Sequence, residues 1–194
     1  MAWRILVGLK DNVRDARGER VKREIREHLG IALHSVRTVD VYTVDAQLGA
    51  DEVAAAAAGP FSDPVIQEYA INQPLARGFD VLIEVGFRPG VTDNSGRTAR
   101  EAIEYLTGRP FASSEAVYTS VQYLLSGEID VAEALDAALD LGQGGFVRGA
   151  AGVGVEPGDD LVRGLARGSG EVRGARSAVE HGLKAGVLGG REGR

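Results

Sequence analysis

The sequence repeats itself at a fixed distance, and this repeat limits the folds that the chain can adopt. GLKDNVRDARGERVKREIREHLG at 8–30 aligns without a gap with GFRPGVTDNSGRTAREAIEYLTG at 86–108, an offset of 78. Further along, the offset becomes 81, and the matching pairs are Val36 with Val117, Thr38 with Thr119 and Tyr42 with Tyr123. A repeat of this length is too long for a solenoid, so it indicates duplication of a small domain.

Each copy is predicted to alternate strands and helices. In the first copy, β-branched and apolar runs predict strands at 3–9, at 35–46 (one long or two short) and at 63–71. An amphipathic helix is predicted over 18–30 and a short second helix over 50–59. The economical arrangement is an α+β fold made of two ferredoxin-like sandwiches, with their antiparallel sheets packed against each other and the helices outside.

The predicted boundaries give two copies and a tail. The first copy takes residues 1–77 and the second takes 78–140, where no counterpart of DPVIQEYAI follows, so its last strand is expected to be missing. The tail, 141–194, holds 16 of the 27 glycines and one aromatic residue. With so little to bury, we expect this tail to be disordered. Two independent domains on a linker are the alternative to packed copies.

Composition excludes several classes of function. The chain has no cysteine, which removes disulfides, thiolate metal sites and cysteine nucleophiles. The formal net charge is −6, which argues against a nucleic-acid partner. No apolar run approaches the length of a membrane span, and the N-terminus lacks a secretory layout. We therefore expect a cytoplasmic protein without a membrane partner.

Individual residues give little sign of catalysis. The three histidines, His28, His34 and His181, share no ligand spacing, so no metal is implied. The loop GVTDNSGRT lacks the spacing and the lysine of a phosphate loop, and a structural turn is favoured. Asp15 and Asp93 stand out because both copies keep them in a varied loop. We favour capping or bonding of loop amides over partner contact for these two aspartates.

The residues of the first copy resemble a known family. LKDNVRDARG before the amphipathic helix, then VRTVDVYTVDA and SDPVIQEYAI, are similar to PurS, the small subunit of phosphoribosylformylglycinamidine synthase, over residues 3–71. The second copy keeps Pro89, Val91, Asp93 and Gly96 of the opening motif. Both copies lack the family's proline after the aspartate and have Ala16 and Asn94 instead.

This resemblance implies a function in purine biosynthesis. The synthase, an ATP-dependent carbon–nitrogen ligase, converts formylglycinamide ribonucleotide to the formylglycinamidine with ammonia released from glutamine. The resemblance implies a non-catalytic subunit that bridges the glutaminase and large synthetase subunits, with no cofactor in this chain and with ATP and Mg²⁺ on the synthetase. It also implies that two copies in one chain stand for a dimer, and it leaves self-association open.

The resemblance places the partner interface, not a catalytic site, in the paired loops. The predicted interface residues are Val13, Asp15, Gly18, Val91, Asp93, Asn94 and Gly96. Two alternatives remain. Paired ferredoxin-like units also form small-molecule sensors of ACT type, and the tail is compatible with a truncated fragment of a fused synthase.

Overall fold

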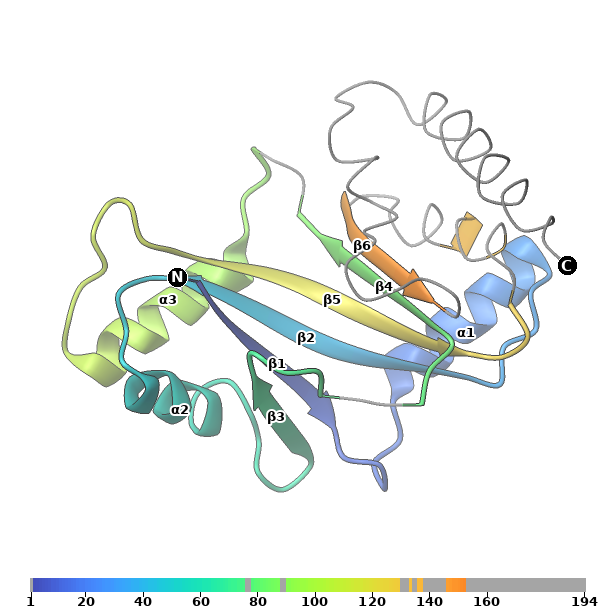
Figure 1. Ribbon diagram of the computed structural model, residues 1–194, viewed down its shortest axis with the longest axis horizontal. Helices are drawn as coiled ribbons and strands as arrows, with labels where there is room; N and C mark the ends of the chain where they lie inside the picture. The colour runs from blue at the N-terminus through green and yellow to red at the C-terminus, as the bar shows by residue number, and fades with distance from the viewer. Residues whose placement is uncertain are drawn as a thin grey trace, which may run out of the picture.

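The two copies form one continuous antiparallel sheet. The computed structural model describes residues 2–75, 78–87, 90–129, 133, 136–137 and 146–152. The elements of the first unit are β1 (Trp3–Leu9), α1 (Ala16–Leu29), β2 (Ser35–Asp45), α2 (Ala50–Ala58) and β3 (Gln67–Ile71). Those of the second are β4 (Val81–Gly86), α3 (Asn94–Thr107), β5 (Ala116–Ser126) and β6 (Phe146–Gly152). The strand order is β3-β1-β2-β5-β4-β6 (Figure 1).

The units meet where β2 pairs with β5, and the pairing has twofold character. Ser35 pairs with Ser126 and Asp45 with Ala116, so Asp40 lies opposite Val121, its own counterpart at the offset of 81. The ladder of β1 with β2 and the ladder of β4 with β5 follow the same two offsets, since Trp3 with Val44 corresponds to Val81 with Leu125. A pseudo-twofold axis therefore passes through the sheet at Asp40 and Val121.

The sequence predicted that two sheets pack face to face, and this prediction is wrong. The sheets join edge to edge, because β2 would otherwise be an exposed edge of eleven residues with unpaired backbone groups. β5 offers the matching edge of the same length. The apolar periodicity of a strand predicts which face is buried, but it carries no information on which strand completes its backbone hydrogen bonds.

The structure also supplies a last strand for the second unit. Phe146–Gly152 pairs antiparallel with β4, as β3 pairs with β1. The expectation that this strand is missing therefore differs from the structure. An edge strand is held by backbone hydrogen bonds, which the glycine-rich sequence FVRGAAG can supply without resembling the first copy. The predicted disorder of the tail beyond it lies outside the described residues.

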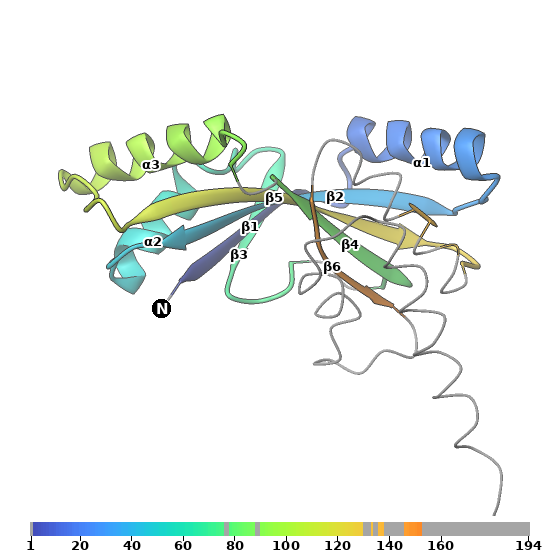
Figure 2. The same cartoon turned by 90° about the horizontal axis from the view of Figure 1, so that it is seen from above.

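Each unit's first helix packs on a strand of its own unit and shares a core with residues of the other unit. On α3, Ala99 and Ile103 share a core with Ile5 and Val7 of β1 and with residues of α2. On α1, Val21 and Ile25 share a second core with Val81 and Ile83 of β4. Figure 2 shows α1 and α3 on the same face of the sheet, over opposite ends of the β2–β5 pair. The two units therefore do not have separate cores, which excludes independent domains.

The face of the sheet opposite α1 and α3 holds a buried polar cluster that also joins the units. The Glu84 carboxylate accepts hydrogen bonds from Arg4 Nη2 (2.7 Å), Ser120 Oγ (2.7 Å) and Gln122 Nε2 (2.9 Å). Burial would raise the pKa of Glu84, but the hydrogen bonds from Arg4, Gln122 and Ser120 outweigh it and hold the pKa below its usual value. Arg4 belongs to β1 and Glu84 to β4, so this ion pair spans both units.

Candidate functional site

Asp15 anchors the start of α1 to the neighbouring strand. As the N-cap residue, its Oδ1 accepts a hydrogen bond from Gly18 N at 2.7 Å. Its Oδ2 accepts from Thr38 N at 2.6 Å and from Thr38 Oγ1 at 2.9 Å. One carboxylate thus satisfies a free amide of the helix end and fixes that end to β2.

Asp93 makes the same contacts at the start of α3. Its Oδ1 accepts from Gly96 N at 2.7 Å, and its Oδ2 accepts from Thr119 N at 2.6 Å. Thr119 Oγ1 donates to the same carboxylate. The capping role predicted for both aspartates is confirmed.

The paired glycines allow these helix ends to approach the sheet closely. A Cβ at Gly18 would lie 2.1 Å from the carbonyl oxygen of Val36, and one at Gly96 would lie 2.4 Å from that of Val117. Both obstacles are backbone atoms, which cannot move aside as a flexible side chain could. Gly18 and Gly96 are therefore explained by packing within the chain.

The other predicted interface residues are open to solvent to different degrees. Val91 is 50% exposed, Asn94 is exposed, and Val13 is half-buried. The described contacts assign them no role comparable with that of the aspartates, so partner contact stays a prediction for them. The two predicted interface loops precede α1 and α3. They lie at the N-terminal ends of these helices, which face the pseudo-twofold axis (Figure 2).

A pocket of about 460 Å³ lies where the two units meet on the helix face. It is lined by residues of both units, among them Arg17, Asp40, Tyr42, Ser95, Thr119 and Tyr123. Arg17 donates to Asp40 Oδ1 at 2.7 Å and to Thr38 Oγ1 at 3.1 Å. Burial raises the pKa of Tyr42 and of Tyr123, so both phenols stay protonated at neutral pH.

Arg17, Tyr42 and Tyr123 were not among the sequence-predicted site residues. Tyr42 and Tyr123 match in the repeat at the offset of 81, and this match was the available signal. Arg17 has Ser95 as its counterpart at the offset of 78, so the repeat gave no indication of it. The pocket can accommodate a small polar molecule between hydroxyl groups and one guanidinium group.

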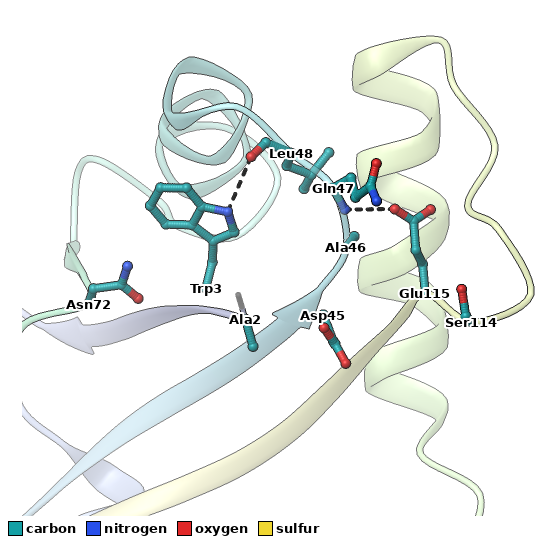
Figure 3. A pocket seen from close by; sticks show the side chains of 9 residues that line it. All are labelled: Ala2, Trp3, Asp45, Ala46, Gln47, Leu48, Asn72, Ser114 and Glu115. Carbon is teal, nitrogen blue, oxygen red and sulfur yellow. Dashed lines mark hydrogen bonds between the residues drawn. The ribbon is translucent and has the colours of Figure 1, made fainter.

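A second pocket, of about 510 Å³, lies at one end of the β2–β5 pair (Figure 3). Glu115 in its wall accepts hydrogen bonds from Arg109, from Gln47 N at 2.7 Å and from Ala112 N at 2.7 Å. The Arg109 contact and these backbone donors lower the pKa of Glu115 to about 2. Trp3 Nε1 in the same wall donates to Leu48 O at 3.3 Å. These groups join loops of the two units, which is a structural role.

The described residues hold neither a cluster of metal ligands nor a membrane-spanning helix. Within the part of the chain that the structure describes, no three His, Cys, Asp or Glu side chains are placed to hold a metal ion. In the same part, no helix has the length and apolar character needed to cross a membrane.

Fold and site together define a class: an α+β protein in which two β-α-β units share one antiparallel sheet and form a pocket at their junction. Residues 2–74 match the family model of PurS, described as phosphoribosylformylglycinamidine (FGAM) synthase. The N-terminal unit is therefore similar to the PurS family, as its sequence motifs predicted. This similarity connects residues 2–74 with FGAM synthase, a ligase of purine biosynthesis. No curated protein and no solved structure matches the chain.

Proposed function

We propose that this chain is a non-catalytic subunit of FGAM synthase that bridges the glutaminase and the large synthetase subunit. The observation that carries the proposal is the pairing of a PurS unit, residues 2–74, with a second unit in one sheet with shared cores. One polypeptide then supplies both halves of the dimer that the PurS resemblance implies. Two units that share one sheet and two cores hold their partner surfaces at a fixed separation, as a bridging subunit requires.

The division of chemistry follows from the residues available. The chain has no cysteine, so a thiol-dependent glutaminase step belongs to another subunit. ATP and Mg²⁺ belong to the large synthetase subunit in this proposal, and the complex works in the cytoplasm. The paired loops before α1 and α3 supply the partner contacts, with Val91 and Asn94 as the accessible side chains.

The test is recovery of the partners from a lysate of the chain's own organism. The tagged full-length chain is incubated with the lysate, with and without glutamine and ADP, and bound proteins are identified by mass spectrometry. We expect a glutaminase and a large ATP-dependent synthetase. If a folded sample retains neither of them, the bridging role is wrong.

Matched variants then locate the contact. Val91→Asp places a charge in the predicted interface, whereas Tyr105→Asp makes the same kind of change at a 92% exposed position on α3. We expect Val91→Asp to weaken partner recovery at least about tenfold, because an unpaired carboxylate is costly to bury in an interface. Tyr105→Asp should retain the partners. Equal recovery with both variants would remove the loop from the interface.

The junction pocket supports a second candidate, a small-molecule sensor. Its position between two units, with Arg17, Tyr42 and Tyr123 in its wall, suits an amino acid or a nucleotide. A ligand that binds only the folded chain raises its melting temperature. A rise with one of these ligands that Arg17→Ala abolishes would favour the sensor. Unchanged melting temperatures across both ligand classes would reject it.

A further inference from the structure

β3 is the last strand at one end of the sheet, and its outer backbone edge is open among the described residues. Of the strands that the structure describes, only β1 pairs with it, and Figure 1 shows β3 at the outer border of the sheet. Asn72 N donates to Arg4 O and Lys10 N to Ile66 O, so the even-numbered residues of this segment turn their backbone groups toward β1. In an antiparallel ladder these directions alternate, so Tyr69 and Ile71 turn their N–H and C=O groups outward.

The start of the strand has its own turn, which limits the open edge. Gln67 N donates to Asp63 O at 2.7 Å, and Val65 N donates to Asp63 Oδ1 at 2.8 Å. The open groups are therefore the carbonyl of Gln67 and both backbone groups of Tyr69 and Ile71. Among the hydrogen bonds given for the described residues outside the helices and strands, none uses the backbone of Tyr69.

β3 is short and carries the exposed Glu68, but it lacks three other features that keep a strand edge from pairing. Natural edges are commonly protected by lysine, proline or a bulge. The sequence QEYAI has neither lysine nor proline, and its register with β1 runs without interruption. Apolar side chains in and just before the strand are exposed, with Val65 at 77%, Ile66 at 41% and Tyr69 at 40%. This edge is open to another strand and offers apolar surface beside it.

The exposed edge is self-complementary about Tyr69. If two copies pair antiparallel with Tyr69 opposite Tyr69, the two tyrosines exchange a reciprocal pair of backbone hydrogen bonds. On each side, Ile71 N–H then meets the open carbonyl of Gln67. Glu68 lies opposite Ala70, so no like charges face each other across the pair. The chain already joins its own units in this way, by antiparallel pairing of β2 with β5 about a twofold axis.

We propose that β3 is a homodimerisation edge, at which two copies of this chain pair β3 with β3 about Tyr69 and continue the sheet across both molecules. The occupant is a second copy because the open donors, the open acceptors and the charges match those of the same strand turned by a twofold rotation. This interface is independent of the FGAM synthase proposal and uses other residues.

Sedimentation velocity of the full-length chain over a range from micromolar to near-millimolar concentration tests the proposal. The wild type should change from monomer to dimer, and the amide of Tyr69 should become protected from hydrogen exchange as the dimer forms. Tyr69→Pro removes the outward N–H without touching the β1 ladder, since proline is tolerated where the N–H faces away from the sheet. We expect it to weaken dimerisation about tenfold or more.

A second variant keeps the test decisive if Tyr69→Pro does not fold. Tyr69→Lys retains the backbone groups but places two ammonium groups opposite each other, so it should also prevent dimerisation. Glu68→Gln, which faces Ala70 in the pair and adds no charge to the edge, is the control and should still dimerise. A wild type that stays monomeric throughout overturns the proposal. So does a folded Tyr69→Pro or Tyr69→Lys that dimerises like the wild type, which would locate self-association elsewhere.

Discussion

At the residue scale, two aspartates each fix a helix end and a strand together. Asp15 and Asp93 cap their helices and accept both the N–H and the hydroxyl of a threonine on the adjacent strand. Their identical roles explain why both loops carry an aspartate although the rest of the loop sequence differs. Substitution of either one affects folding, so the exposed Val91 is the better probe of partner contact.

Replacement of Asp15 or Asp93 by alanine should lower the free energy of unfolding by about 2–4 kcal/mol. Loss of an N-cap costs about 1 kcal/mol, and an unpaired threonine N–H adds about 1–3 kcal/mol. Urea unfolding followed by circular dichroism measures the change. Asp51→Ala is the control, because this first-turn carboxylate on α2 is exposed and should contribute less than about 1 kcal/mol. Equal losses for all three variants would contradict the anchoring role.

The repeat alone was sufficient to select these residues but not to assign their partners. Matching Asp15 with Asp93 and Gly18 with Gly96 predicted a shared structural need, and capping was the favoured explanation. The sequence could not show that Thr38 and Thr119 receive the second carboxylate oxygen, because that contact depends on how the helix end sits on the strand. Arg17 escaped prediction because its counterpart, Ser95, is chemically different.

At the scale of elements, Glu115 connects the start of β5 to the loop after β2. Its pKa of about 2, against an ordinary 4.5, means that the folded state holds the carboxylate ionised more strongly than the unfolded chain does. This contribution to stability is complete above pH 4.5 and is lost as the pH falls through the folded pKa of about 2. Acidification should therefore destabilise the chain within this window.

Glu115→Gln should flatten that part of the pH dependence, since the amide does not titrate. The measurement compares urea midpoints at neutral pH with midpoints at a pH between the two pKa values, for the variant and the wild type. Glu101→Gln serves as the control, because the Glu101 side chain is 66% exposed and its pairing with Arg97 is loose at 4.0 Å. An unchanged acid response in Glu115→Gln would show that other carboxylates carry the effect.

Most elements of the first unit could be predicted from the sequence, and their mutual arrangement could not. Amphipathic spacing located α1, and β-branched residues located β1 and β2. Strand β3 begins at Gln67 and not at 63, because Asp63 closes a turn there. The edge-to-edge joining of β2 with β5 and the placement of β6 depend on backbone hydrogen bonds, which leave little trace in side-chain patterns.

At the scale of the whole molecule, the shared cores predict a single cooperative unfolding transition. Trp3, the only tryptophan, packs against the core that contains β1, whereas Ile83 is fully buried in the other core. Ile83→Ala should lower the free energy of unfolding by about 2–5 kcal/mol. Trp3 fluorescence should report the full shift despite its position in the other core. If the unfolding transition followed by Trp3 fluorescence is unchanged by Ile83→Ala, the two units unfold separately.

The pseudo-twofold axis at Asp40 and Val121 has a consequence for how such a chain can diversify. In a dimer of identical subunits, a residue on the axis faces its own copy, and an aspartate there would stand against another aspartate, which is unfavourable. Here Val121 occupies the opposite position, and Asp40 is free to pair with Arg17 at 2.7 Å. Joining two units in one polypeptide lets each half accept mutations that its twin does not carry, so the centre of the molecule can become chemically one-sided.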